Sequence, residues 1–460
     1  MKITVLSGSP KGNLSVTLQY IHYIQKKYPQ HEFNIHHVSQ KIKAIEKKED
    51  RFQKIVQDVG SSDAVWWVVP VYVMLVPSQY KRFIELIWKY QAQAAFKDKY
   101  TAVFTTSIHF YDHTANSYMR AICDDLDMRF VDFLSLKMFD LLDENERTKL
   151  HYFTDRFFSL AEKGTPTARC YPKIAYQEVA FIPETPLSKI DTGGKKILLI
   201  SDQNDHSSNL GKMIQRFEEA FEGQIETVFM GDLKIMGGCL GCIKCGFENK
   251  CTYEGIDDYI EFFNTKIVPA DIVVYAGAIK DRYLSADFKQ FFDRKFFNTH
   301  IPVQRDKQIA FILSGPLGQV ANLREILQAM IEMDMGNLAG IVTDESGDSQ
   351  SINGLIQDLA ENLVNAANVN YVKPMTFLGI GGRKLFRDEV YSNMRFPFLA
   401  DHEYYEANGF YDFPDENSKE FQHSVKMLEA IKDPEFRKQV RNSMTENLVK
   451  PLQEFVEKNA

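Results

Sequence analysis

The sequence lacks the features that define several large classes of protein. No apolar run approaches the roughly 18 residues that a membrane-spanning helix needs. Basic charge is not in excess, because the formal net charge is −8 at pH 7, so a general affinity for nucleic acid or anionic membrane is not expected. The opening MKITVLSGSP has neither the apolar stretch nor the cleavage site of a signal peptide. We therefore predict a cytoplasmic protein that binds neither nucleic acid nor membrane.

Two nucleotide-binding motifs are also missing, and cysteine is scarce. The chain has no Walker lysine motif and no loop with the three spaced glycines of dinucleotide-binding folds. It has 6 cysteines in 460 residues, and four of them lie between positions 239 and 251. In a cytosolic chain, such a compact group binds metal more often than it forms disulfides.

The first 165 residues alternate short β-rich runs with amphipathic helical patterns, which begin near positions 15, 49, 77, 113 and 145. Runs such as AVWWVVPV lack period-two alternation, which is typical of strands buried on both faces of a parallel sheet. Strands interleaved with helices in this way predict a doubly wound α/β sheet. The five predicted strands are Ile3–Leu6, Phe33–Val38, Ala64–Val69, Ala102–Thr106 and about Phe130–Leu136.

The same pattern then restarts, which predicts two such sheets in tandem. KKILLIS matches MKITVLS, DIVVYAGA matches DAVWWVVP, and KQIAFILSG matches KYTAVFTTS, in the same order and at similar spacing. An internal duplication explains this better than chance. We predict a first domain over 1–165, a linker over 166–194 with a short strand near Glu178–Ile182, a second domain over 195–370, and a helical C-terminal extension over 371–460.

The loop after the first strand, SGSPKGNLSVTLQYI, predicts a phosphate site. A parallel sheet binds ligands at the carboxyl ends of its strands, and the following helix directs free N–H groups and a positive dipole at an anion. Gly8 and Gly12 allow a close backbone approach, and hydroxyls rather than glycines favour a monophosphate such as that of FMN. The alternative is a Ser/Gly turn that caps a helix. The polar candidates are Ser9, Lys11, Asn13, Ser15 and Thr17.

The loops after the third and fourth strands lie where a flat ring would rest on the sheet edge. Their backbone N–H groups can bond a flavin ring, and Tyr72 and Met74 supply apolar area. His109 is a candidate for proton delivery, because histidine titrates near neutral pH. Asp112 is expected to cap the helix that starts at His113. The ring candidates are Pro70, Val71, Tyr72, Val73 and Met74, with Ser107, Ile108, His109 and Phe110.

GSPKGNLSVT followed by PVY and PSQYKRFIE resembles the NAD(P)H-dependent FMN reductase and flavodoxin-like family, over about 1–165 and 195–370. The resemblance implies that Ser9, Ser15 and Thr17 hold the FMN phosphate, that Pro70 to Met74 line the ring, and that Ser107 to Phe110 close its third side. It also implies NAD(P)H as a candidate electron donor.

GGCLGCIKCGFENKC, with Cys239, Cys242, Cys245 and Cys251, has the compact spacing of ferredoxin-type ligand runs. Zinc sites more often use two cysteine pairs split by a longer loop, and a redox-active or vestigial set of thiols is the other alternative. The quartet followed by EGIDDYIEFF resembles the iron–sulfur flavoproteins, a branch of the same family. This resemblance implies a [4Fe–4S] cluster that exchanges electrons with FMN.

The second half has a poorer phosphate loop, SDQNDHSSNLGKM, because Asp202 and Asp205 put negative charge where a dianion would lie. Lys280, Asp281 and Arg282 replace the ring loop, either to bind an anionic group or as a surface charge trio. We therefore expect FMN in the first half and the cluster in the second, facing each other across a pseudo-twofold interface.

These observations predict an electron-transferring iron–sulfur flavoprotein. One alternative is an NAD(P)H-dependent FMN or quinone reductase without a working cluster, and another is a redox-sensing protein that binds flavin without turnover. A small molecule or a protein such as ferredoxin would be the redox partner, and a homo-oligomer is compatible with the sequence. Aromatic residues of the extension either cover the flavin or only bury apolar area; they are Tyr404, Tyr405, Phe410, Tyr411 and Phe413.

Overall fold

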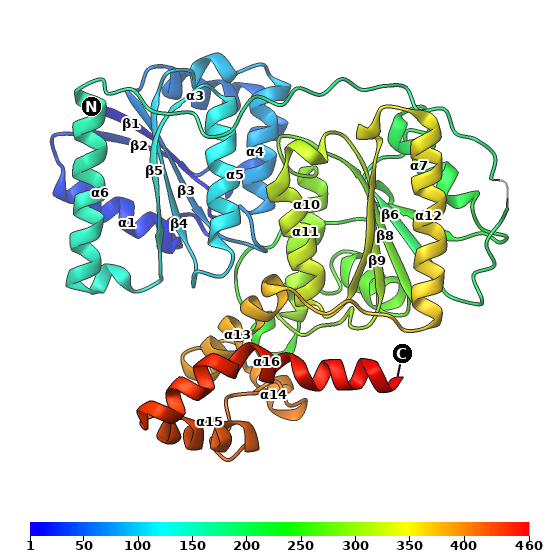
Figure 1. The fold of residues 1–460 in the computed structure, drawn as a ribbon. Helices are drawn as coiled ribbons and strands as arrows, with labels where there is room; N and C mark the ends of the chain where they lie inside the picture. Colours follow the sequence, from blue (N-terminus) through cyan, green and yellow to red (C-terminus); the bar gives the residue numbers. More distant parts are fainter. Residues whose placement is uncertain (187, 460) are drawn as a thin grey trace. The chain divides into compact units, whose positions relative to one another are not determined.

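The computed structural model describes residues 1–186 and 188–459. The chain divides into two units, Met1–Tyr404 and Tyr405–Ala460. The first unit holds two separate five-stranded sheets, each covered by helices on both faces (Figure 1).

The first sheet consists of β1 (Lys2–Ser7), β2 (Glu32–His36), β3 (Ala64–Pro70), β4 (Tyr100–Thr106) and β5 (Arg129–Leu136). Its strands lie in the order β2-β1-β3-β4-β5 and all neighbours are parallel. One face packs on α1 (Val16–Lys27) and α6 (Glu144–Glu162). The other face packs on α3 (Glu49–Gly60), α4 (Ser78–Lys89) and α5 (Asp112–Asp125), with the short α2 (Ile42–Lys47) beside them.

The second sheet repeats this plan with β6 (Ile197–Ser201), β7 (Glu226–Phe229), β8 (Ile272–Ala278), β9 (Gln308–Ser314) and β10 (Asn337–Thr343), in the order β10-β9-β8-β6-β7. One face packs on α7 (Asn209–Glu218) and α12 (Ser349–Asn368). The other packs on α9 (Tyr259–Phe262), α10 (Ala286–Arg294) and α11 (Ala321–Met333), while α8 (Cys245–Glu248) carries a cysteine. The predicted pair of doubly wound parallel sheets followed by C-terminal helices is confirmed.

The two halves keep one spacing over most of their length. Ala64 of β3 and Ile272 of β8 are 208 residues apart, and so are Tyr100 of β4 and Gln308 of β9. The difference lies before β3 and β8. Ile3 pairs with Ala64 across 61 positions, whereas Ile197 pairs with Ile272 across 75. The 14 additional residues belong to the stretch that contains the four cysteines.

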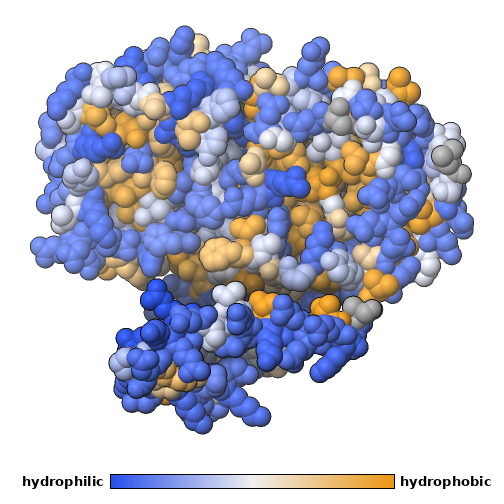
Figure 2. Space-filling view, in the orientation of Figure 1, coloured by the Kyte–Doolittle hydropathy of each residue, from blue (hydrophilic) through white to orange (hydrophobic). Residues whose placement is uncertain are grey.

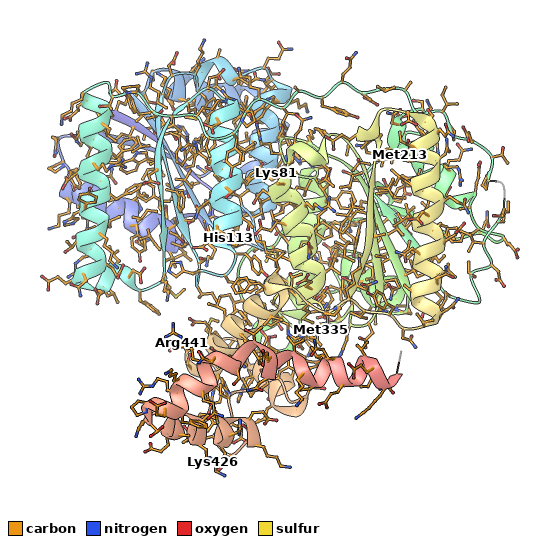
Figure 3. The ribbon with its side chains drawn as sticks, in the orientation of Figure 1. Lys81, His113, Met213, Met335, Lys426 and Arg441 are labelled. Atoms are coloured by element: carbon orange, nitrogen blue, oxygen red, sulfur yellow. The ribbon has the colours of Figure 1, made fainter. Side chains whose placement is uncertain are left out.

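The halves meet where α4 packs against α10, with Lys81 at the contact (Figures 1 and 3). Lys81 pairs with Glu85 at 3.2 Å, and at the corresponding positions of α10 Lys289 pairs with Asp293. All four side chains are buried. The Glu85 carboxylate accepts the backbone N–H of Ala286 at 2.7 Å, and the Asp293 carboxylate accepts that of Ser78 at 2.8 Å.

This exchange satisfies helix ends that would otherwise be costly to bury. The first N–H groups of a helix have no intrahelical partner, and they favour a negative charge nearby. Each half therefore caps the third helix of the other with a carboxylate from its own third helix. Because the two caps are related by a pseudo-twofold axis, both fix the same geometry.

The charged trio of the second half belongs to this interface. Asp281 lies 3.5 Å from Lys81, and Arg282 makes a bidentate pair with Asp125 at 2.6 and 2.7 Å. Lys280 lies 3.6 Å from Glu85. The expectation of an anion site or a surface trio is therefore wrong, because partners in the first half already neutralise these charges.

The predicted strand at Glu178–Ile182 does not form, although the structure describes all five residues. The segment crosses the carboxyl ends of the second sheet, so it cannot join a ladder of strands. Side chains replace the missing ladder: Asn209 bonds the backbone of Phe181 and Val179, and Asn353 bonds that of Glu184 and Ile182. We call residues 175–184 the strap.

After α12 follow α13 (Phe377–Ser392), α14 (Leu399–Ala407), α15 (Lys419–Ala430) and α16 (Pro434–Asn459). In the second unit, Tyr405 stacks on Phe410, and Tyr411 stacks on Phe413. The face in Figure 2 is mainly hydrophilic, with apolar residues in scattered patches. Within the described residues, no helix combines the length and apolar character needed to cross a bilayer.

Removal of one carboxylate from the interface is expected to destabilise the chain. Asp293→Ala leaves Lys289 buried without its partner and uncaps α4, which should lower the free energy of unfolding by about 3 kcal/mol. Urea unfolding measures the change. Asp132→Asn is the matched control, since its pair with Arg156 is exposed and 3.7 Å long, and it should cost less than about 0.5 kcal/mol. Equal effects of the two substitutions would contradict the role given to Asp293.

Candidate functional site

The loop between β1 and α1 presents an anion-binding helix end. Ser15 caps α1 by accepting the N–H of Leu18 at 3.3 Å, which leaves the N–H groups of Val16 and Thr17 without an intrahelical acceptor. Ser9 is buried and its hydroxyl accepts the N–H of Lys11 at 3.3 Å. The hydroxyl of Thr17 lies 2.6 Å from that of Thr106, so it ties α1 to β4.

Two glycines in this loop are required by their surroundings. A Cβ on Gly8 would lie 2.9 Å from the Tyr80 ring and would overlap Val69. Gly12 has φ +57 and lies against the side chain of Gln40. The backbone can therefore approach a ligand closely only because both positions lack a side chain.

The loop after β3, Pro70 to Met74, makes a tight turn in which Val73 and Met74 have positive φ. The N–H of Tyr72 donates to the carbonyl of Leu75 at 2.7 Å. The Tyr72 hydroxyl is buried without a hydrogen-bond partner in the described part of the chain. Burial raises the pKa of Tyr72 well above its usual value, so the phenol is neutral. A buried polar atom left unpaired at this position is compatible with a site that a ligand completes.

The loop after β4 places His109 in a hydrogen-bonded group. Its Nδ1 lies 2.9 Å from Asp112 Oδ2, which also accepts the Ser135 hydroxyl. Burial acts to raise the pKa of Asp112, but the hydrogen bonds from Ser135 and His109 outweigh it and hold that pKa below its usual range. Asp112 also accepts the N–H of His113 at 3.0 Å, so the expected cap exists, but α5 begins at Asp112 itself. The sequence gave no signal for Ser135, which comes from β5.

The cysteine segment of the second half lies against the ring loop of the first half. Gln79 donates to the carbonyl of Cys239 at 3.1 Å, and Lys43 donates to that of Met236. A Cβ on Gly241 would overlap the hydroxyl of Tyr72. The extra residues of the second half therefore contact the ring loop predicted for the flavin.

The four cysteines are free thiols that interact with one another. Cys239 lies within electrostatic reach of Cys242 and Cys245, and Cys245 within reach of Cys251. Burial raises the pKa of the Cys239 and Cys245 thiols to about 12. Across residues 1–186 and 188–459, no group of three or more His, Cys, Asp or Glu side chains is arranged to hold a metal ion. The fit to a [4Fe–4S] cluster is thus incomplete, and the cluster stays a prediction.

The corresponding edge of the second sheet is occupied by the chain itself. The strap residue Ala175 exchanges two hydrogen bonds with Gln319 at 2.9 and 3.0 Å, and the hydroxyl of Tyr176 donates to Asp344 at 3.0 Å. In the loop after β6, Asp205 accepts the N–H of Ser207 at 2.9 Å, where an anion would otherwise be bound. Carboxylates and the strap together leave this edge poorly suited to FMN.

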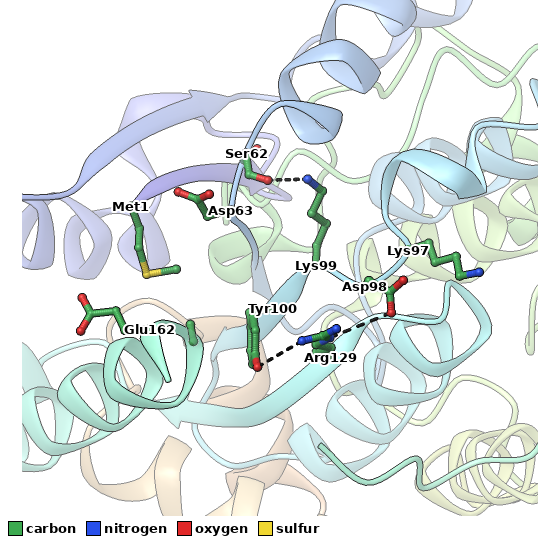
Figure 4. A pocket seen from close by; sticks show the side chains of 10 residues that line it. Met1, Ser62, Asp63, Lys97, Asp98, Lys99, Tyr100, Arg129 and Glu162 are labelled. Carbon is green, nitrogen blue, oxygen red and sulfur yellow. Dashed lines mark hydrogen bonds and ion pairs between the residues drawn. The ribbon is translucent and has the colours of Figure 1, made fainter. Parts of the chain in front are cut away.

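A pocket elsewhere in the first half does not belong to this site (Figure 4). It lies at the amino ends of the strands, opposite the loops described above. Lys99 donates to the carbonyl of Ser62 there at 2.6 Å, and Arg129 to the hydroxyl of Tyr100 at 3.4 Å. Its lining is Met1, Ser62, Asp63, Lys97, Asp98, Lys99, Tyr100, Arg129, Ala161 and Glu162.

A family model described as NADPH-dependent FMN reductase matches residues 1–136 and again residues 195–346, one match in each half. Among solved structures, FerB of Paracoccus denitrificans, a flavoenzyme NAD(P)H:(acceptor) oxidoreductase, is 19% identical over 35% of this chain and 97% of its own, with a TM-score of 0.30. The NAD(P)H:quinone oxidoreductase of Methanothermobacter marburgensis is 12% identical over 36% of this chain and 99% of its own, with a TM-score of 0.27. No curated protein matches the chain.

The second-half phosphate loop makes stability depend on pH. Burial raises the pKa of Asp202, beside Ser285, to about 6, so its ionised form is disfavoured in the folded chain. Stability is then fully present below about pH 4 and is lost as pH rises through 6. Asp202→Asn should stabilise the chain at pH 8 by roughly 1 to 3 kcal/mol and leave it unchanged at pH 4. Urea unfolding at the two pH values tests this, with the exposed Asp306→Asn as control. A gain independent of pH would contradict it.

Proposed function

This chain belongs to the NADPH-dependent FMN reductase family, and we propose that it is an FMN-dependent NAD(P)H oxidoreductase with one FMN in its first half. The observation that carries the proposal is the contrast between the two sheet edges. The first has a free helix N-terminus, hydroxyls and required glycines, whereas the second is closed by the strap and by carboxylates. When bound, FMN accepts a hydride from NAD(P)H and passes electrons on in pairs or singly.

In this proposal the phosphate is held by the N–H groups of Val16 and Thr17 and by the polar side chains of the same loop. The hydroxyl of Thr17 contributes less than expected, since it already bonds Thr106. Pro70 to Met74 and Ser107 to Phe110 bind the ring, chiefly through backbone N–H groups, and His109 exchanges protons with Asp112 as its partner. The side chains proposed around the phosphate are Ser9, Lys11, Asn13 and Ser15.

The acceptor is proposed to be a quinone or free flavin, with NAD(P)H as donor. Relatives named as NAD(P)H:(acceptor) and NAD(P)H:quinone oxidoreductases support this choice of reaction class. Reduction of neither acceptor by any nicotinamide donor would instead favour a redox-sensing protein without turnover. A cytoplasmic location and a protein partner such as ferredoxin are part of the proposal.

The second candidate adds the iron–sulfur branch of the family. One observation favours it: the segment of Cys239 lies against Tyr72 and Gln79 of the ring loop. A [4Fe–4S] cluster held by Cys239, Cys242, Cys245 and Cys251 would then lie close enough to FMN for electron exchange. The four thiols are close to one another, and metal binding would require them to lose their protons and converge.

A charge placed in the phosphate loop should separate the two halves. Asn13 is exposed, so Asn13→Asp is compatible with the fold, and its carboxylate would repel the phosphate dianion. We expect the dissociation constant of FMN, measured by quenching of flavin fluorescence, to rise at least about tenfold at low salt. Ser207→Asp, in the corresponding loop of the second half, should leave it unchanged. The reverse pattern would place FMN in the second half.

Anaerobic purification tests the cluster. Reconstituted protein should contain about four iron and four sulfide per chain, with absorption near 400 nm that dithionite bleaches. Cys245→Ser should abolish this iron content, whereas Cys123→Ser, at a buried cysteine outside the quartet, should not. Iron and sulfide contents near zero in the unmodified chain would leave the reductase without a cluster.

A further inference from the structure

A histidine of the second half is held by a buried carboxylate next to the flavin loops of the first. His300 follows Thr299, whose positive φ of 52 turns the chain after the helical turn Lys295–Asn298. Asp401 of α14 is fully buried and accepts His300 Nδ1 at 2.9 Å and the His300 N–H at 2.9 Å. It also accepts the Thr299 hydroxyl at 2.7 Å. Three donors thus fix this carboxylate, and with it the imidazole.

Aromatic rings from four segments enclose this imidazole. Phe110, from the third flavin loop, meets it edge to face at 6.2 Å between centroids. Phe386 of α13 lies against the same ring, and the remaining contacts come from Phe296 and Phe398. The His300 side chain is 13% exposed. Its Nε2 has no hydrogen-bond partner among the residues that the structure describes, so it is the atom open to a ligand.

This arrangement suits a proton donor. With Nδ1–H directed at Asp401, the imidazole has a single orientation, and Nε2 can take up and release a proton. Residues 101 positions apart make no such pair by chance proximity in sequence, and the pair's only other protein contacts on its ring are apolar. His109 forms a similar couple with Asp112, but its side chain is 44% exposed to solvent.

We propose that His300 Nε2 gives a proton to a quinone-class acceptor reduced at the first-half site, with Asp401 as the positioning residue. Reduction of a quinone to a hydroquinone consumes two electrons and two protons. NAD(P)H supplies two electrons and one proton as hydride and becomes NAD(P)⁺. The second proton leaves His300 Nε2 for a quinone oxygen, and solvent reprotonates the imidazole. The inference rests on the proposed function and adds a second-half residue to that site.

The test compares an acceptor that needs a proton with one that does not. Ferricyanide takes up one electron and no proton, whereas benzoquinone needs both. With NADPH as donor, His300→Gln should lower kcat for benzoquinone about 100-fold and change kcat for ferricyanide less than twofold. Asp401→Asn should lower the benzoquinone-to-ferricyanide ratio in the same direction. In His300→Ala, added imidazole should restore benzoquinone reduction.

A readout without turnover accompanies these rates. Diethyl pyrocarbonate should modify His300 at the open Nε2 in the FMN-free chain, and bound FMN should slow that modification at least about threefold. His151, on α6 and paired with Tyr23, is the internal control for labelling, and His151→Gln is the control variant for the rates.

The outcomes separate the two claims. An unchanged benzoquinone-to-ferricyanide ratio in His300→Gln, or its loss in His109→Gln alone, would overturn the inference while leaving the reductase intact. Labelling of His300 that FMN does not slow would also overturn it. An unmodified chain that binds no FMN, or that reduces neither acceptor, would overturn the proposed function and this inference together.

Discussion

The exchange of buried carboxylates between α4 and α10 is the constraint on which the rest of the first unit depends. Glu85 and Asp293 each cap the opposite helix, and each is neutralised by a lysine one turn away. Both helices directly follow the tight turns of the ring loops. Holding the helix starts therefore also holds those turns, and the cysteine segment comes to lie on Tyr72.

A symmetric frame has been given asymmetric chemistry. The same spacing of 208 residues relates β3 to β8 and β4 to β9, and Ser15 and Ser208 cap the first helices in the same way. The side chains beyond those caps differ. One loop keeps hydroxyls and an open edge, whereas the other has Asp205 and the strap. Duplication preserved what the fold needs, while only one copy kept what a phosphate needs.

Local patterns in the sequence were sufficient for the sheets, their order and the duplication, because buried parallel strands are long apolar runs. They were insufficient for pairings between distant segments. Lys81 and Glu85 read as ordinary helix surface residues, and nothing local indicates that Ser78 and Ala286 would need caps. The strap was predicted as a strand because its β-rich pattern does not reveal that it crosses the strand ends. Ser135 and the His300–Asp401 couple were missed for the same reason.

The central claim is that one frame carries one flavin site, to which both halves contribute. Isothermal titration of FMN into the flavin-free chain tests it most directly. The account predicts a single saturable site, with a stoichiometry of one FMN per chain. A stoichiometry of two equivalent sites would contradict it, since the second sheet edge would then be open to FMN despite the strap.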